Sequence, residues 1–189
     1  MLNTVILNVE NIGFTDAQFY QLCLDNQDLQ LERTAKGELV IMPPVGGISG
    51  GREADLIGLL WVWNRQSQLG KVFSSNTLFR LPEGGDRSPD AAWVSLEKWE
   101  GLTEEEKAGF PPICPEFVIE VRSRSDSLKP LQEKMLEYLQ SGLQLGWLID
   151  PQNQQVEIYR PHTTVEVRSF PVSLSGESVL PGFTVELLE

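Results

Sequence analysis

The sequence predicts an α+β protein, and two observations carry this prediction. Short apolar runs rich in β-branched residues, bounded by Gly, Pro and Asp, indicate strands. Longer segments with apolar residues at helical spacing lie between them. The 189 residues contain no repeats and no linker long enough to divide them. We therefore expect a single domain over 1–189, with an N-terminal helix and hairpin at about 14–44 and a core at about 50–188.

The first elements follow from local signals. Apolar spacing after Thr15 and Asp16 predicts a helix over 14–26. Residues 29–34 and 38–42 alternate like two strands of a hairpin around Gly37. The glycine-rich stretch 46–51 lacks the Gly-Lys-Ser/Thr ending of a P-loop. We interpret it as a flexible connection into the next helix.

That next helix is predicted over 52–68, and Glu53 lies within its apolar face together with Leu56 and Leu60. Surface helices place glutamate on the polar side, so this position suggests a functional acid. The alternative is an acid in the first turn, favoured by the helix dipole. The five tryptophans mostly lie in apolar periodic runs, which favours core positions over base-stacking platforms.

Further strands are predicted from the same patterns, at 71–74, 77–81, 91–94, 115–123 and 145–150, then a hairpin at 156–159 and 165–167 and a last segment at 181–185. The acidic stretch between 95 and 114 is typical of a solvated helix that begins after Thr103. A helix over 128–140 ends before Gly142.

The strand at 115–123 has a carboxylate in its middle. Because residues alternate between faces of a strand, Glu120 and Arg122 project to one side, opposite Ile119 and Val121. A charge in a buried run costs several kcal/mol unless a partner or a metal compensates it. Asp90, at the start of an earlier apolar run, is a candidate to share such a site with Glu120.

Lys134 is the cationic candidate. It lies at one margin of the apolar stripe of the helix over 128–140, where its stem can pack while its amine reaches inward, and Gln132 lies at the other margin. Together with Glu53, Asp90 and Glu120 it forms a set suited to phosphodiester hydrolysis. Carboxylates bind Mg²⁺ or Mn²⁺, and a lysine can orient or deprotonate water or stabilise developing charge.

Spacing alone leaves other interpretations open. Asp90 can cap a turn, Glu120 can pair with Arg122, and Lys134 can be an ordinary solvated lysine. Two carboxylates without a metal would instead suit a glycoside hydrolase. The single histidine, His162, follows Pro161 in a predicted turn, which weakens mechanisms that need a catalytic histidine.

Several motifs in combination resemble a family of restriction-endonuclease-like proteins that is numerous in cyanobacteria, within the PD-(D/E)XK nuclease superfamily. The motifs are Ser-Pro-Asp-Ala at 88–91, Phe-Val-Ile-Glu-Val-Arg-Ser at 117–123, Gln-Glu-Lys-x(3)-Tyr at 132–138 and Gly-Trp-Leu-Ile-Asp-Pro at 146–151. The resemblance covers about residues 15–188. It implies a restriction-endonuclease-like core, a mixed β-sheet flanked by helices, and a Mg²⁺-dependent nuclease site at one edge of the sheet.

The resemblance also implies roles for individual residues. Asp90 and Glu120 match the two metal-binding acids, and Glu53 corresponds to the helical acid that often joins them. The superfamily lysine usually stands two residues after the second acid, where this chain has Arg122, which cannot readily act as a base. The resemblance makes Lys134 its substitute, so the catalytic candidates are Asp90, Glu120, Lys134, Glu53 and Arg122. Gln132 and Ser123 are candidates for supporting contacts.

Composition limits the partners. The formal net charge is −12, from 15 Lys and Arg against 27 Asp and Glu, which argues against tight DNA binding across the whole surface but not against a local basic cleft. We expect no membrane span and no signal peptide. Neither Cys23 nor Cys114 has metal-ligand spacing, and a reduced cytoplasmic setting is the default expectation.

The sequence therefore leads to two hypotheses for the function. The first is a Mg²⁺- or Mn²⁺-dependent DNA endonuclease. The second is a catalytically weak or inactive module of the same fold that binds DNA or a protein partner, suggested by the acidic charge and by Arg122. Cleavage of both DNA strands would favour a homodimer, and exposed edge strands offer one route to it.

Overall fold

A six-stranded mixed sheet forms the centre of the protein. The computed structural model describes residues 4–9 and 11–188. The strand order is β11–β10–β9–β8–β7–β4, and β8 and β9 are parallel while the other neighbours are antiparallel. The strands are β4 (Gly70–Ser74), β7 (Ala91–Ser95), β8 (Phe117–Val121), β9 (Leu145–Asp150), β10 (Gln155–Tyr159) and β11 (Glu166–Ser169).

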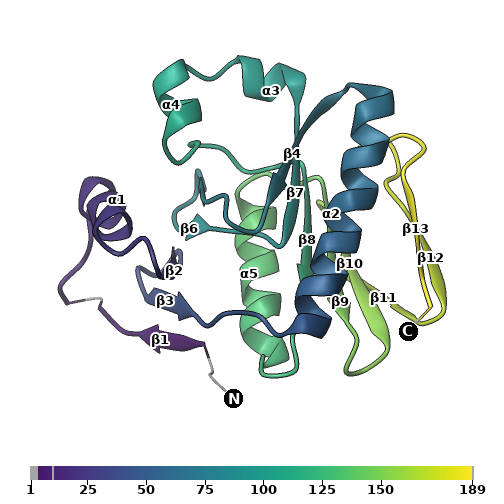
Figure 1. The fold of residues 1–189 in the computed structure, drawn as a ribbon, viewed down its shortest axis with the longest axis horizontal. Coiled ribbons are helices and arrows are strands. Elements are labelled where there is room, and N and C mark those ends of the chain that lie inside the picture. Colours follow the sequence, from purple (N-terminus) through teal and green to yellow (C-terminus); the bar gives the residue numbers. More distant parts are fainter. Residues whose placement is uncertain (1–3, 10, 189) are drawn as a thin grey trace.

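Two smaller sheets accompany it. A five-stranded sheet has the order β1–β3–β2–β6–β5, and a two-stranded sheet pairs β12 with β13. Their strands are β1 (Val5–Leu7), β2 (Gln30–Arg33), β3 (Leu39–Met42), β5 (Phe79–Arg80), β6 (Asp86–Arg87), β12 (Val172–Ser175) and β13 (Thr184–Leu187). The five-stranded sheet lies with α1 on one side of the molecule, and the β12–β13 pair lies on the other (Figure 1).

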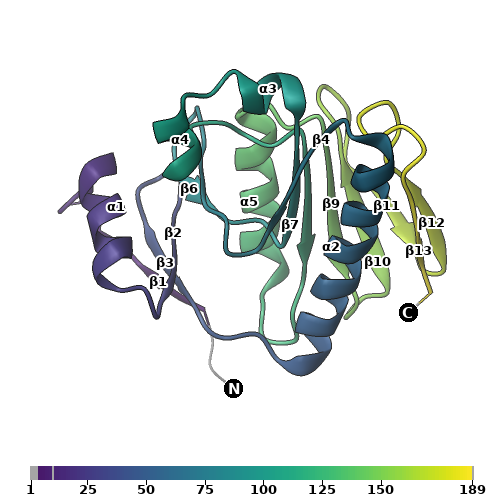
Figure 2. The same ribbon diagram turned by 45° about the horizontal axis from the view of Figure 1, so that its top comes forward.

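The helices are α1 (Asp16–Asp25), α2 (Gly47–Ser67), α3 (Leu96–Glu100), α4 (Glu104–Ala108) and α5 (Leu128–Gln140). Helix α5 connects the parallel strands β8 and β9, as a parallel pair requires a crossover. Figure 2 shows α5 and α2 on opposite sides of the six-stranded sheet. The sheet is thus covered by helices on both faces.

Alternation along the strands divides the core between these two faces. Ile119 and Val121 face the cluster that contains Leu56 and Leu60 of α2. Val118 faces a second cluster that contains residues of α5. Glu120 lies opposite Ile119 and Val121, as the sequence predicts, and it points to the α5 face because it shares the parity of Val118.

Several predicted elements are confirmed. Thr15 and Thr103 begin α1 and α4 through capping boxes, and α5 spans 128–140 as expected. The predicted flexible connection at 46–51 is wrong. Gly47 already begins α2, and the Gly50 N–H donates to the Gly46 carbonyl over 2.9 Å. Tertiary packing along the length of α2 stabilises the helix and offsets the poor helix propensity of the glycines in its first turns.

Four further observations concern residues and properties for which the sequence led to an expectation. Both cysteines are free, and His162 is exposed in a turn with a φ of 59°. Trp61 is 53 % exposed, so the prediction that the tryptophans are core residues is wrong at this position. Within the part of the chain that the structure describes, no helix is both long and apolar enough to cross a membrane.

Candidate active site

Strand register brings the two predicted acids together. Strands β7 and β8 pair antiparallel with Ala91 opposite Ile119, so one step further along the ladder Asp90 stands opposite Glu120. The Val121 N–H donates to Asp90 Oδ2 over 2.6 Å, which fixes the Asp90 carboxylate against β8. Opposed positions on neighbouring strands place side chains about 5 Å apart at Cβ. The two carboxylates therefore belong to one site.

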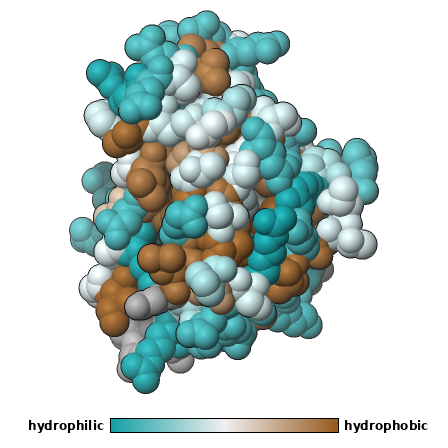
Figure 3. Space-filling view, turned by 90° about the vertical axis from the view of Figure 1, so that its right-hand side faces the viewer, coloured by the Kyte–Doolittle hydropathy of each residue, from teal (hydrophilic) through white to brown (hydrophobic). Residues whose placement is uncertain are grey.

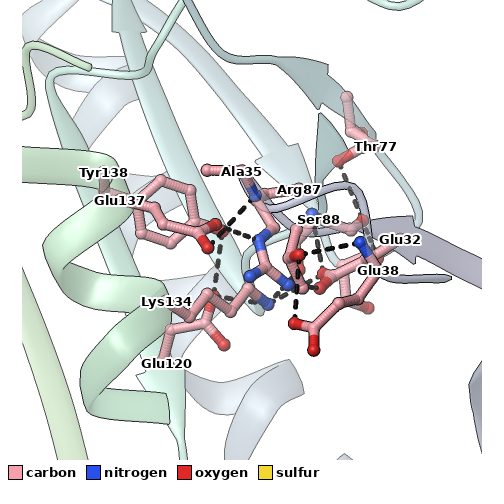
Figure 4. Close-up of polar contacts among 12 residues, drawn as sticks. Glu32, Ala35, Glu38, Thr77, Arg87, Ser88, Glu120, Lys134, Glu137 and Tyr138 are labelled. Carbon is pink, nitrogen blue, oxygen red and sulfur yellow. Dashed lines mark hydrogen bonds and ion pairs between the residues drawn. The ribbon is translucent and has the colours of Figure 1, made fainter. Parts of the chain in front are cut away.

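Lys134 enters this site from α5 and is buried, so it is not the solvated lysine that the sequence left open. Its Nζ lies 2.8 Å from Glu120 Oε1 and donates to the Ser88 carbonyl over 2.9 Å. The Tyr138 hydroxyl donates to the same Glu120 oxygen over 3.0 Å. Figure 4 shows Lys134 and Tyr138 of α5 converging on Glu120. One oxygen of Glu120 thus receives two hydrogen bonds from one helix.

A third carboxylate, Glu32 of β2, completes the surroundings of Lys134. Glu32 Oε1 lies 2.8 Å from Lys134 Nζ and accepts from the Ser88 N–H over 2.8 Å (Figure 4). Glu32 Oε2 accepts from Arg87 Nη1 over 2.9 Å, and Arg87 Nε donates to Glu137 over 2.6 Å. Lys134 therefore has three acceptors, which equals the number of donors on an ammonium group.

Burial and neighbouring charges set the protonation of these groups. Burial raises the pKa of Asp90 well above its usual value, and the nearby Glu120 charge raises it further. Burial and the Glu32 charge also raise the pKa of Glu120, although Lys134 opposes them. Burial alone would raise the pKa of Glu32, but the charges of Lys134 and Arg87 outweigh it and lower that pKa.

Lys134 is held as a cation. Burial favours the neutral amine, but the carboxylates of Glu120 and Glu32 outweigh it and raise the pKa of Lys134 above its ordinary value. An amine with so high a pKa keeps its proton at neutral pH. In this geometry Lys134 offers positive charge and hydrogen bonds, and it is not poised to accept a proton.

Glu53 lies on α2 and is half-buried. As the sequence predicts, it is on the same face of the helix as the buried Leu56. Its charge adds to the raised pKa of Asp90, after the larger effects of burial and of the Glu120 charge. No three His, Cys, Asp or Glu side chains of residues 4–9 and 11–188 are gathered closely enough to form a metal-binding group. The structure thus brings Asp90 and Glu120 together and leaves Glu53 at their margin.

Arg122 is engaged elsewhere. Its Nη1 lies 3.0 Å from Asp150 Oδ2, and its Nε donates to the Asp126 carbonyl over 3.1 Å. Asp150 is fully buried at the end of β9, so Arg122 compensates an acid that would otherwise be costly. The alternative in which Glu120 pairs with Arg122 is therefore wrong, because Glu120 pairs with Lys134.

The other two candidates for supporting contacts lie nearby. Gln132 of α5 donates to Glu157 Oε1 over 2.7 Å, and Tyr159 donates to Glu157 Oε2. Glu157 and Glu120 are both paired with Leu148, from either side, so the two acids share one row of the sheet. Ser123 Oγ lies 3.1 Å from Ser125 Oγ in the segment after β8.

Two carboxylates of the site, Asp90 and Glu120, are suitable ligands for one hard divalent cation. Mg²⁺ is usually held by one or two carboxylates, with waters and substrate oxygens in its other positions. Asp90 and Glu120 supply this pair. Both have raised pKa values, so a neighbouring positive charge would stabilise their ionised forms. Asp90 and Glu120 would therefore hold the ion, and the described residues do not form a three-residue group that includes Glu53.

Sequence reasoning missed Glu32, Arg87 and Tyr138. Glu32 carries the same signal as Glu120, a carboxylate within a short strand, yet in a hairpin it looks like an ordinary exposed residue. Its burial depends on Arg87 and Lys134, which are distant in the chain. Tyr138 is a buried aromatic residue of α5, and its position in the sequence does not indicate that its hydroxyl donates to Glu120.

Comparison with known proteins agrees with this fold. A family model, Uma2, described as putative restriction endonuclease, matches residues 16–188. The crystal structure of a putative nuclease belonging to DUF820 from Anabaena variabilis ATCC 29413 superimposes with a TM-score of 0.77 at 21 % identity, covering 92 % of this chain and 94 % of that one. No match was found among the curated proteins. The predicted α+β, restriction-endonuclease-like fold is confirmed.

Proposed function

The chain belongs to the Uma2 family of restriction-endonuclease-like proteins, and from this we propose that it is a Mg²⁺- or Mn²⁺-dependent endonuclease that hydrolyses phosphodiester bonds in DNA. One observation carries the proposal. Asp90 directly precedes β7 and accepts from the Val121 N–H of β8, next to Glu120, and a buried ammonium lies 2.8 Å from Glu120. Two acids with a fixed cation match the charge that develops when a phosphodiester is attacked.

Each side chain of the site has its own role in this proposal. Asp90 and Glu120 would hold the cation, which supplies Lewis acidity and a more acidic bound water. Lys134 positions Glu120 through their 2.8 Å contact and adds positive charge beside the scissile phosphate. Tyr138 holds the same Glu120 oxygen. Because Lys134 stays protonated, the proton of the attacking water passes to another acceptor, such as an oxygen of the substrate phosphate.

The segment that follows β8 supplies basic groups for the DNA backbone. Arg124 and Lys129 are exposed between β8 and the first turn of α5, close in sequence to Glu120. A duplex is held mainly through its phosphates by Lys and Arg. This local basic segment reconciles DNA binding with a net charge of −12. Binding of this kind weakens as salt concentration rises.

A cleavage assay with matched variants tests the proposal. Supercoiled plasmid is incubated with the protein in Mg²⁺, in Mn²⁺ and in EDTA, and conversion to nicked and linear forms is followed on gels. We expect metal-dependent cleavage that falls at least about a hundredfold in Asp90→Asn and Glu120→Gln. Glu186→Gln changes an exposed acid on β13 and serves as the control. Equal cleavage by Glu120→Gln and wild type would refute the assignment.

The second candidate function is a non-catalytic module of the same fold that binds DNA or a protein partner. It is favoured by one specific observation: the Lys134 ammonium and the Nε and Nη1 groups of Arg122 are engaged within the protein. Calorimetric titration with Mn²⁺ separates the two. Binding that is lost in Glu120→Gln favours the enzyme. Absence of Mn²⁺ binding, with DNA binding retained in EDTA, favours the module.

A further inference from the structure

Helix α2 exposes an apolar face that no other part of the described chain covers. Its outward large apolar side chains are Ile48, Leu59, Trp61 and Val62, which are 76 %, 48 %, 53 % and 50 % exposed. Figure 3 views the side of the molecule that carries α2 and the β12–β13 hairpin, and brown apolar side chains gather across the middle of that side. Soluble proteins rarely leave such a group open without a partner.

The exposed residues form one stripe along the helix. Gly51, Asp55, Gly58, Val62 and Arg65 follow each other at intervals of three or four residues, and all are exposed. A Cβ added at Gly51 or Gly58 would meet nothing within 4 Å. Glycine in a helix interior costs up to about 1 kcal/mol relative to alanine. The two glycines on the outer face therefore make the helix less stable than alanines would. Because they have no side chains, another helix can approach the backbone closely.

We propose that this face of α2 binds the same face of a second copy of the chain, with the two helices antiparallel about a two-fold axis near position 60. The charges on the stripe are self-complementary in this arrangement. Asp55 and Arg65 lie at equal distances on either side of position 60, so each Asp55 meets Arg65 of the other copy, twice per dimer. Gly58 and Val62 are likewise equidistant, so Val62 of one copy fits over Gly58 of the other.

A second copy fits this face better than other occupants do. Each chain carries a net charge of −12, so two copies can associate only through a surface with little net charge. The stripe has one acid and one base. Arg65 lies over the Trp61 ring, 5.4 Å from its centroid, which holds both side chains in place before association. Exposed Trp and Arg are the residues enriched at interface centres.

The size of the surface predicts a moderate affinity. Helix α2 has 21 residues, or roughly 31 Å of length, and exposed Val45 and Leu69 extend the apolar surface beyond its ends. One helix pair with these flanks buries an area at the lower end of the range for specific dimers. We therefore expect a dissociation constant in the micromolar range.

Charge reversal tests the proposed register. Sedimentation equilibrium of the full chain over a concentration series gives the dissociation constant. We expect Asp55→Arg and Arg65→Asp each to raise it about tenfold or more, since each places like charges together. The double variant restores wild-type affinity. A mixture of the two single variants forms heterodimers, because every Arg of one copy then faces an Asp of the other.

A control addresses the competing edge-strand route. Val62→Glu is expected to give a monomer, whereas Val167→Glu, on the exposed edge strand β11, leaves the dimer intact. Circular dichroism confirms that each variant is folded. A wild-type protein that stays monomeric at several hundred micromolar, a dimer broken by Val167→Glu and not by Val62→Glu, or single reversals that leave the dimer unchanged would each overturn the proposal. None of these outcomes depends on nuclease activity.

Discussion

Replacing Glu32 with glutamine removes one charge from the centre of the buried network. Glu32 is 1 % exposed and contacts Lys134 Nζ, Arg87 Nη1 and the Ser88 N–H at 2.8, 2.9 and 2.8 Å. Glutamine has nearly the same shape and still offers one oxygen to the Ser88 N–H. What it removes is the negative charge that compensates two buried cations.

The magnitude follows from the cost of an uncompensated buried charge. Removing one partner of a buried ion pair costs about 3–5 kcal/mol. Lys134 retains Glu120 and Arg87 retains Glu137, so we expect the lower end, about 3 kcal/mol. For a chain of 189 residues this corresponds to a fall in the unfolding temperature of about 6–12 °C. Urea unfolding followed by tryptophan fluorescence measures the free energy directly.

A double-mutant cycle shows that the loss arises from the network. Glu32→Gln is combined with Lys134→Met, and the coupling energy between the two sites is expected to be about 1–3 kcal/mol. Glu186→Gln, an exposed acid, is expected to change stability by less than about 0.5 kcal/mol. If Glu32→Gln is as stable as wild type, Glu32 does not compensate Lys134 and the described network is wrong.

Three further predictions concern other parts of the structure. Because folding raises the pKa of Asp90, the folded protein binds an extra proton, and without metal its stability falls as pH rises above about 4 towards the folded pKa. Asp90→Asn is expected to reduce this fall in urea titrations at a series of pH values, and the raised pKa of Glu120 contributes the remainder. Arg122→Gln leaves the fully buried Asp150 without its cation and is expected to cost about 3 kcal/mol in the same titrations, whereas an undiminished stability would contradict the pairing. Gly70→Ala drives a Cβ into a carbonyl and an indole ring of β7 and is expected to lower stability by about 2 kcal/mol or more. Gly51→Ala, where nothing in the same chain lies within 4 Å, is expected to be neutral or stabilising in thermal unfolding at protein concentrations too low for the proposed dimer.

The sequence predicted the half of the site that follows from local geometry. Strand alternation placed Glu120 on the face opposite Ile119, and the apolar stripe of α5 located Lys134 at a margin that faces inward. Both inferences need only the period of one element. The same reasoning placed Glu53 on the buried side of α2, and the structure leaves it half-buried there.

The remaining half depends on how separate sheets meet. Glu32 belongs to the five-stranded sheet and Glu120 to the six-stranded one, and both contact Lys134. The residue pattern of β2 does not predict the contact between Glu32 and Lys134. Glu32 is buried by Arg87 and α5, and not by its neighbours in the sequence. The exposed face of α2 was missed for a related reason. The sequence predicts Trp61 to be a core residue because it lies in an apolar run, but Leu56 and Leu60 fill the buried face of the helix and Trp61 lies outside it.

This arrangement links the candidate site to the N-terminal hairpin. Lys134 reaches Glu120 from α5, but its position is shared with Glu32 on β2, and the Ala35 N–H after β2 donates to Glu137 of α5 over 3.2 Å. The hairpin therefore contacts α5 at Lys134 and Glu137, beside the six-stranded sheet. Without it, Lys134 would keep one carboxylate instead of two, and its pKa would fall towards the ordinary value as the balance with burial shifts. The β2–β3 hairpin is thus part of what keeps Lys134 charged and directed at Glu120, and the six-stranded sheet alone does not define the site.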